Sequence, residues 1–268
     1  MKYKLLVLDL DGTLTNSQKK ISARTKNSLI MAQERGITIV LASGRPTYGI
    51  VPLAEELQLA NYGGYILSYN GGTIINWKTK EVIHESVIST EKLPLLHKIA
   101  VQNGVEIISY QDEHIISETS DNEYIQYEAF LNKMVIKEVE SFTDEVSFPV
   151  PKCLIVGKPD KLQQLEGEMI GMFGDEMSIY RSEPFFLELM PVNIDKAKSL
   201  QRLLDHTGHT REEMMACGDG FNDLSMIEFA GMGVAMANAQ DVVKQASDYI
   251  TLSNEEDGVA HAVEFFLS

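Results

Sequence analysis

Residues 4–14 read Lys4-Leu5-Leu6-Val7-Leu8-Asp9-Leu10-Asp11-Gly12-Thr13-Leu14. An unbroken apolar run followed by polar turn residues is typical of a strand that is buried on both faces of a parallel sheet. Open α/β sheets bind ligands outside the carboxyl ends of their strands, so Asp9 and Asp11 are candidates for a binding site. Two neighbouring carboxylates repel each other unless a cation or a shared proton lies between them. We therefore predict a metal site at this strand end.

Strands and helices alternate in both terminal parts of the chain. Ser22 is predicted to cap a helix over residues 23–35, and apolar runs predict strands over 37–42, 65–68, 214–217, 233–236 and 249–251. A small hairpin is expected over 73–76 and 81–85. This alternation predicts an α/β fold with a doubly wound, Rossmann-like parallel sheet.

The pattern changes in the middle of the chain. Predicted helices at 91–102 and 159–173 are interspersed with strands at 105–110, 114–118, 152–157, 177–180 and 185–190. Residues 121–134 read as an amphipathic segment, and 138–145 read as a solvated acidic stretch. Helices between antiparallel strands are typical of an α+β unit. We predict an α/β core domain of residues 1–85 and 188–268, interrupted by an α+β cap domain of residues 86–187.

Composition excludes several classes of function. The chain has 268 residues, with 23 Lys and Arg against 39 Asp and Glu, which gives a formal charge of −16. That charge opposes non-specific binding to nucleic acid or to an anionic membrane. Neither a membrane span nor a signal peptide is predicted, so a cytoplasmic protein is expected. Cys153 and Cys217 lie in apolar runs and are predicted to be buried free thiols. The sequence does not specify an oligomeric state.

Five polar features follow predicted strands or begin predicted helices. They are Asp9-x-Asp11, Ser43, Asn70, Lys196 and Asp219-x-x-Asn222-Asp223. Phosphoryl transfer needs charge neutralisation around the phosphoryl oxygens, and a carboxylate nucleophile divides hydrolysis into two displacements. Mg²⁺ prefers oxygen ligands and often takes one or two carboxylates together with phosphate and water. Such a site needs one Asp to attack, one to handle protons and one to hold metal, with Lys and Ser binding phosphoryl oxygens.

The sequence resembles the haloacid dehalogenase (HAD) superfamily. Asp9-Leu10-Asp11-Gly12-Thr13-Leu14 looks like motif I, Ser43 in Leu41-Ala42-Ser43-Gly44-Arg45 like motif II, Lys196 like motif III, and Gly218-Asp219-x-x-Asn222-Asp223 like motif IV. The order of the motifs and the long insertion between motifs II and III resemble Cof-type hydrolases with a C2 (class IIB) cap. The resemblance covers nearly the whole chain.

The resemblance implies a role for each acidic residue. Asp9 would be the nucleophile, and Asp11 would protonate the leaving group and then activate water. The carboxylate of Asp9, the backbone carbonyl of Asp11 and Asp219 would bind Mg²⁺. Asp223 would support a metal-bound water or Lys196.

The resemblance also implies how the phosphoryl group is held. Ser43, Gly44 and Lys196 would contact it, and Asn222 would bind phosphate or brace its loop. Arg45 and Asn70 occupy positions where relatives carry groups that contact substrate or loops. Many relatives have glycine after the motif III lysine, whereas this chain has Ala197, which suits the start of a helix better.

Some of these residues have simpler structural explanations. Ser43 can be a helix N-cap, and Asp223 can cap the helix that follows it. His206 and His209 do not have the spacing of zinc ligands. Tyr124, Tyr127 and Phe130 have helical spacing, which is typical of a cap core and less often of a substrate shelf.

The predicted function is a Mg²⁺-dependent phosphatase that acts on a small phosphorylated metabolite, such as a sugar phosphate, a nucleotide cofactor or pyridoxal phosphate. Two alternatives share the aspartyl-phosphate chemistry. One is a phosphosugar phosphotransferase or mutase, and the other is a phospho-aspartate signalling module. The sequence does not name the substrate, and Arg181, Glu183 and His114 are only guesses for cap residues that contact it.

Overall fold

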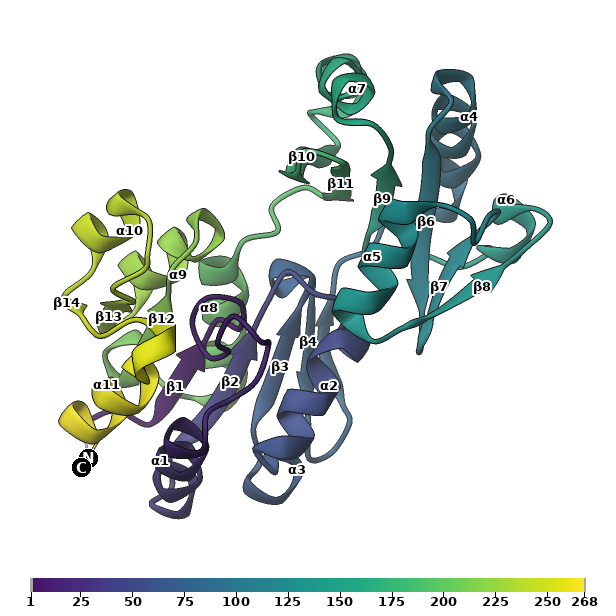
Figure 1. Ribbon diagram of the computed structural model, residues 1–268. Helices are drawn as coiled ribbons and strands as arrows, with labels where there is room; N and C mark the ends of the chain where they lie inside the picture. Colours follow the sequence, from purple (N-terminus) through teal and green to yellow (C-terminus); the bar gives the residue numbers. More distant parts are fainter. Residues whose placement is uncertain (1, 268) are drawn as a thin grey trace. The chain divides into compact units, whose positions relative to one another are not determined.

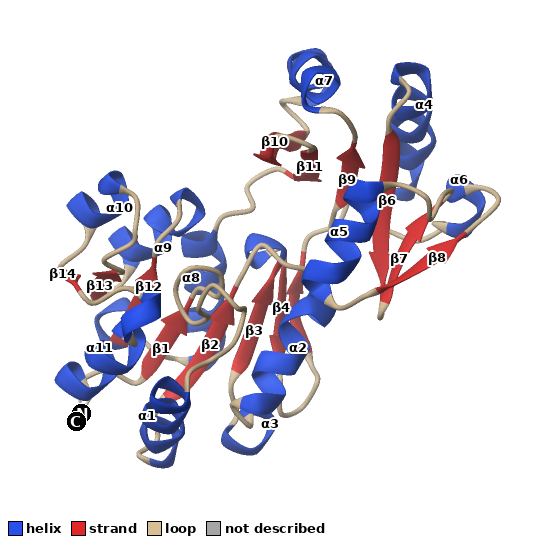
Figure 2. Cartoon of the chain, in the orientation of Figure 1, coloured by secondary structure: helices blue, strands red, loops and turns tan. Residues whose placement is uncertain are grey.

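The computed structural model describes residues 2–267, and the chain divides into two compact units. One unit runs up to His84 and resumes at Asp195, and the other comprises Glu85–Ile194. Figures 1 and 2 show a separate β-sheet in each unit.

An eight-stranded sheet forms the first unit, with the strand order β14-β13-β12-β1-β2-β3-β4-β5. Its strands are β1 Leu5–Leu8, β2 Thr38–Ala42, β3 Tyr65–Ser68, β4 Thr73–Asn76, β5 Val82–Glu85, β12 Met214–Gly218, β13 Met232–Ala235 and β14 Tyr249–Ile250. Its helices are α1 Ala23–Glu34, α2 Thr47–Glu56, α3 Leu59–Tyr62, α8 Lys196–Thr207, α9 Leu224–Phe229, α10 Asp241–Ala246 and α11 Gly258–Phe266. The sheet is mostly parallel, and the α/β fold predicted from the sequence is confirmed.

The register of the central strands brings the polar motifs together. Strand β1 pairs in parallel with β12 on one side and with β2 on the other, as Figure 1 shows. Leu8 at the end of β1 lies opposite Cys217 in β12 and Leu41 in β2. Because these strands end at the same level, the residues that follow them, Asp9 and Asp219 among them, meet at one edge of the sheet.

The second unit contains a six-stranded mixed sheet with the order β10-β11-β9-β6-β7-β8. Its strands are β6 Glu106–Gln111, β7 His114–Ser117, β8 Val135–Glu138, β9 Cys153–Val156, β10 Met177–Glu183 and β11 Phe186–Pro191. Its helices are α4 Leu93–Asn103, α5 Glu123–Asn132, α6 Phe142–Glu145 and α7 Pro159–Phe173. All of its pairings are antiparallel except β7 with β8. This unit forms the cap, and its mixed sheet agrees with the α+β prediction.

Two parts of the cap differ from the sequence prediction. Residues 138–145 are not simply a solvated stretch, because Phe142 within them is fully buried in the cap core and begins α6. Phe130 does not belong to the core, because 77% of it is exposed, and 43% of Tyr127 is exposed. Tyr124 instead stacks on Phe185, with ring centroids 5.0 Å apart.

Cys153 and Cys217 are buried and free, as the sequence predicts. Within residues 2–267, no helix has the length and apolar character needed to cross a bilayer.

Candidate active site

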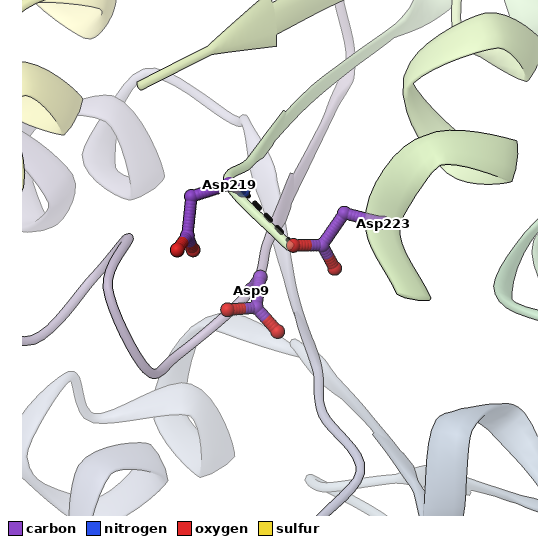
Figure 3. A group of neighbouring side chains, drawn as sticks. All are labelled: Asp9, Asp219 and Asp223. Carbon is purple, nitrogen blue, oxygen red and sulfur yellow. Dashed lines mark hydrogen bonds between the residues drawn. The ribbon is translucent and has the colours of Figure 1, made fainter. Parts of the chain in front are cut away.

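Three acidic side chains meet at the edge of the core sheet. Oxygen atoms of Asp9, Asp219 and Asp223, one from each carboxylate, all lie within 4.8 Å of one another. Asp9 directly follows β1 and Asp219 directly follows β12, so both come from the ends of adjacent strands. Figure 3 shows the three carboxylates turned toward a common space. The geometry therefore gathers acids that are far apart in the sequence.

Lys196 is the cation of this cluster and is 1% exposed. Its Nζ atom lies 2.7 Å from Oδ1 of Asp9, 2.5 Å from Oδ1 of Asp223 and 2.9 Å from the carbonyl oxygen of Ala42. An ammonium group has three N–H donors, and these three acceptors use all of them. Lys196 is also the first residue of α8, where the positive end of the helix dipole opposes it. The acids beside Lys196 offset that repulsion.

Asp223 holds the loop that carries Asp219. Its Oδ2 atom accepts hydrogen bonds from the backbone N–H groups of Asp219 and Gly220, both at 2.9 Å, and Figure 3 draws the first of them. Its other oxygen accepts from Lys196. Asp223 is completely buried, and its side chain does not cap α9. The carboxylate thus connects the loop after β12 to the lysine.

The turn after Asp11 orients Asp219. Thr13 Oγ1 donates a 2.7 Å hydrogen bond to Oδ1 of Asp219. Gly12 has φ +85°, and a Cβ atom at that position would lie 2.4 Å from Oδ2 of Asp219. Only glycine combines that backbone conformation with so close an approach. The glycine of motif I is therefore required by the position of the Asp219 carboxylate.

Asp11 lies apart from the three clustered carboxylates. Arg45 donates two hydrogen bonds to the Asp11 carboxylate, from Nε to Oδ2 at 2.7 Å and from Nη2 to Oδ1 at 2.6 Å. Lys19 Nζ donates to the same Oδ1 at 2.7 Å. Lys19 has a left-handed backbone with φ 58°, and a turn around Asn16 supports it. Two cations therefore hold the side chain of Asp11.

The remaining predicted site residues line the adjacent loops. The N–H of Asn70 donates to the carbonyl oxygen of Ser43 at 2.8 Å, and Nδ2 of Asn222 donates to Oδ1 of Asn70 at 3.3 Å. A Cβ atom on Gly44 would lie 3.3 Å from the Asn70 amide. Tyr69, Asn70 and Gly71 all have positive φ angles. The asparagine pair thus connects the loop after β2 with the loop after β12.

Ser43 does not act as the cap of α2. Pro46 occupies the N-cap position of that helix, and the Ser43 hydroxyl oxygen accepts a 3.2 Å hydrogen bond from the N–H of Arg45. The helix begins at Thr47, later than an N-cap at Ser43 would require, because Ser43 to Arg45 form a separate turn. The N-cap alternative for Ser43 is therefore wrong.

Burial and crowding shift the ionisation of the acids. Burial raises the pKa of Asp9 well above its usual value, and the nearby Asp223 adds to this against the opposing effect of Lys196. Burial raises the pKa of Asp219 to about 6, although the hydrogen bond from Thr13 lowers it. Burial is the main cause of both shifts, and the neighbouring carboxylate of Asp223 adds to each of them.

The pKa values of Asp11 and Lys196 move in the directions that favour their charged forms. Burial alone would raise the pKa of Asp11, but the hydrogen bonds and charges of Arg45 and Lys19 outweigh it and hold the pKa low. Burial alone would lower the pKa of Lys196, but Asp223 and Asp9 outweigh it and raise the pKa. Asp11 is thus an anion and Lys196 a cation in this arrangement.

The donor set fits a hard divalent cation. Three clustered carboxylates with one ammonium leave two negative charges in excess when all are ionised. All of the available ligand atoms are oxygens, which Mg²⁺ prefers over nitrogen or sulfur. The raised pKa values of Asp9 and Asp219 are the electrostatic consequence that a bound cation would relieve. The residues present therefore suit Mg²⁺.

Comparison with known proteins decides the family. Residues 6–263 match the haloacid dehalogenase-like hydrolase family. The chain belongs to that family. Its similarity to curated and solved relatives places it with the Cof-type members of subclass IIB, and it is a HAD-type phosphatase, a phosphoric monoester hydrolase.

Three relatives illustrate the similarity. A 5-amino-6-(5-phospho-D-ribitylamino)uracil phosphatase of Bacillus subtilis is 31% identical, covering 98% of this chain and 96% of that protein. A haloacid dehalogenase-like hydrolase from Bacteroides thetaiotaomicron is 57% identical, with a TM-score of 0.97 over 98% of this chain and 99% of its own. A sugar phosphatase of HAD subclass IIB is 29% identical, with a TM-score of 0.81 over 98% of each chain.

Some residues of the site carried no clear signal in the sequence. Lys19 lies in a polar stretch, and nothing in the local pattern indicates that its ammonium group reaches Asp11. Thr13 lies within motif I, and its hydrogen bond to Asp219 was not predicted from the sequence. The position of its hydroxyl group directly after the Asp11-Gly12 turn is the sequence feature that could have indicated a role for Thr13 in the site.

Proposed function

We propose that this phosphatase is Mg²⁺-dependent and hydrolyses the phosphate monoester of a small metabolite through a phosphorylated Asp9. The observation that carries the proposal is the cluster of Asp9, Asp219 and Asp223 around Lys196. When bound, Mg²⁺ would be held by Asp9, Asp219 and the backbone carbonyl of Asp11, and would neutralise charge on the phosphoryl oxygens. Phosphate monoesters are among the slowest substrates to hydrolyse without a catalyst, with enzymes accelerating them by up to ~10²¹-fold.

Asp9 is the proposed nucleophile. One of its carboxylate oxygens attacks phosphorus, a new O–P bond forms, and the bond from phosphorus to the leaving alkoxide breaks. Lys196 contacts Asp9 directly, so it orients the attacking carboxylate and offsets negative charge that builds up on the phosphoryl oxygens. Ser43, Gly44 and Asn222 lie on the loops that adjoin this carboxylate cluster and are the proposed phosphate-binding groups.

Asp11 is the proposed proton carrier. Because Arg45 and Lys19 favour its anionic form, Asp11 must first take up a proton from solvent, and it gives this proton to the leaving alkoxide in the first displacement. It then takes a proton from the water whose oxygen attacks the phosphorus of phospho-Asp9, which releases inorganic phosphate and restores the Asp9 carboxylate. The bonds from Arg45 and Lys19 favour the ionised form of Asp11, which is the form that the second displacement requires.

The substrate class is proposed from the relatives. One relative is named for a phosphorylated ribityl compound and another is a sugar phosphatase. Both names describe a phosphate on a polyhydroxylated carbon chain. We therefore favour a phosphorylated sugar or sugar alcohol over a nucleotide cofactor or pyridoxal phosphate.

A panel of phosphorylated metabolites tests this proposal. Release of inorganic phosphate is measured for sugar phosphates, sugar alcohol phosphates, nucleotide cofactors and pyridoxal phosphate, in Mg²⁺ and in EDTA. The proposal predicts Mg²⁺-dependent release with the highest kcat/KM among sugar or sugar alcohol phosphates. Release that is equal in EDTA contradicts the metal dependence, and a preference for pyridoxal phosphate or a nucleotide contradicts the substrate class.

A further inference from the structure

Two asparagines from the C-terminal part of the core hold the turn that follows Asp11. Asn238, in the loop after β13, donates through Nδ2 to the carbonyl oxygen of Gly12 at 2.8 Å. Asn254 donates through Nδ2 to the carbonyl oxygen of Thr15 at 2.9 Å. We call the side chains of Asn238 and Asn254 the asparagine clamp. The first of these bonds spans 226 residues of sequence and the second spans 239.

The two members of the asparagine clamp are also bonded to each other. The backbone N–H of Asn254 donates to Oδ1 of Asn238 at 3.1 Å. The side-chain amide of Asn238 therefore makes two hydrogen bonds. Its oxygen accepts from the N–H of Asn254, and its NH₂ group donates to the carbonyl oxygen of Gly12. An amide whose orientation is fixed in this way can hold its acceptor in one place.

The turn that the asparagine clamp holds is the one that orients Asp219. The carbonyl of Gly12 belongs to the peptide unit that leads into Thr13, and Thr13 Oγ1 bonds Oδ1 of Asp219 at 2.7 Å. The Asp219 carboxylate also packs against Gly12 itself. A rotation of this peptide unit would thus move both contacts that orient Asp219.

The loop that carries Asn238 is hydrogen-bonded to the end of β12, next to Asp219. The N–H of Met236 donates to the carbonyl oxygen of Gly218 at 3.1 Å, and the N–H of Gln240 donates to that of Asp219 at 3.0 Å. Asn238 lies between these two anchors in the sequence. It therefore connects the turn after Asp11 with the strand end that carries Asp219.

We propose that Asn238 and Asn254 are positioning residues for the divalent cation, because they fix the Gly12–Thr13 peptide that orients Asp219. The proposal rests on the metal dependence proposed above. Neither side chain belongs to the carboxylate cluster, and the Asn238 bond to Gly12 is solvent-exposed, so the contribution of that bond to overall stability is small. Groups that orient metal ligands from the next layer typically change metal affinity by about 10–100-fold when removed.

The test is calorimetric titration of Mg²⁺, without substrate, into the wild-type protein and into four variants. Asn238→Ala removes the bond to Gly12 and the acceptor for Asn254. Asn238→Asp keeps that acceptor but loses the donor to Gly12. Asn254→Ala removes only the bond to Thr15. The control, Asn103→Ala, removes an amide that donates to the carbonyl oxygen of Ile99 at 2.9 Å in the cap.

We expect the dissociation constant for Mg²⁺ to rise about tenfold in Asn238→Ala and in Asn238→Asp. A smaller rise is expected in Asn254→Ala, and no change in the Asn103→Ala control. Circular dichroism of each variant establishes that it is folded, and if Asn238→Ala fails to fold, Asn238→Asp and Asn254→Ala decide the question.

Wild-type affinity in the Asn238 variants overturns the role of the asparagine clamp while leaving the phosphatase proposal intact. Absence of Mg²⁺ binding by the wild-type protein overturns the metal dependence itself, and this inference with it. The two failures are therefore distinguished in one experiment.

Discussion

The Nζ atom of Lys196 lies 2.7 Å from Oδ1 of Asp9, although 187 residues separate the two in the sequence. Both side chains are almost completely buried, and Asp223 contacts the same ammonium group. A buried cation among acids is costly to remove because the remaining charges lose their partner. The relationship makes Lys196 a structural part of the site as well as a candidate for catalysis.

Replacing Lys196 by Met tests this structural role. Lys196→Met keeps the volume of the side chain but leaves Asp9 and Asp223 without their cation. We expect the free energy of unfolding in EDTA to fall by about 3–5 kcal/mol, as measured by urea denaturation. The matched control is Lys198→Met on the same helix, where Lys198 is exposed and a change within about 0.5 kcal/mol is expected. Equal losses in the two variants would contradict the account.

Replacing Gly12 by Ala tests the close approach to Asp219. Gly12 and Gly36 both have positive φ angles, at +85° and +89°, but a Cβ atom on Gly36 has no other atom within 4 Å. Each substitution incurs the left-handed backbone cost of roughly 1–2 kcal/mol. Only Gly12→Ala pushes a methyl group against a proposed metal ligand, so only it should weaken Mg²⁺ binding, by about tenfold or more in calorimetry. Equal Mg²⁺ affinity in Gly12→Ala and Gly36→Ala would refute this explanation.

Replacing Asp219 by Asn tests the charge at the site through pH. The pKa of Asp219 in the folded protein is raised to about 6 from 3.8, so between these values the folded state holds a proton that the unfolded state has lost. Stability from this group therefore falls as pH rises from about 4 to 6 when no divalent cation is present. Asn lacks this titration and keeps an acceptor for Thr13.

The thermal midpoint in EDTA measures the difference. We expect Asp219→Asn to melt above the wild-type protein at pH 7.5 and close to it at pH 4.5. Mg²⁺ should reverse the order at pH 7.5, because it stabilises only the protein that binds it. A constant gap between the two proteins across this pH range would show that Asp219 has an ordinary pKa.

Replacing Asp11 by Asn tests proton transfer. Asn cannot carry the proton, and we expect phosphate release to slow by about 10²–10⁴-fold at saturating substrate. Binding of Mg²⁺ should be unchanged, because the Asp11 side chain lies outside the carboxylate cluster and is held by Arg45 and Lys19. A variant with wild-type turnover would remove Asp11 from the proton-transfer role.

The sequence predicted the core well because local pattern and tertiary structure agree there. Leu5–Leu8 and Ile39–Ala42 are continuous apolar segments, and both lie in central strands and are fully buried. The motif residues follow such strands directly, so their convergence at one sheet edge could be inferred from parallel topology alone.

The sequence predicted less where structure depends on distant partners. Strand β8, Val135–Glu138, is an edge strand with little burial, so no period-2 pattern marks it, and it exists because it pairs with β7. Lys19 and Asn238 are exposed polar residues whose partners lie 8 and 226 residues away. Local sequence does not contain the loop geometry that brings such residues to their partners.

The most direct test of the account is to look for a phosphoryl group on Asp9. The Asp11→Asn variant is incubated with a phosphorylated sugar and Mg²⁺ and sampled over a time course, because loss of the proton carrier slows both displacements. Each sample is quenched in acid and digested, and the masses of its peptides are measured by mass spectrometry. The account predicts that the peptide containing Asp9 gains the mass of one phosphoryl group and that Asp9→Asn,Asp11→Asn does not. Phosphate release by the single variant Asp9→Asn is measured alongside. Release at the wild-type rate by Asp9→Asn, together with no phosphopeptide from Asp11→Asn, would contradict the central claim.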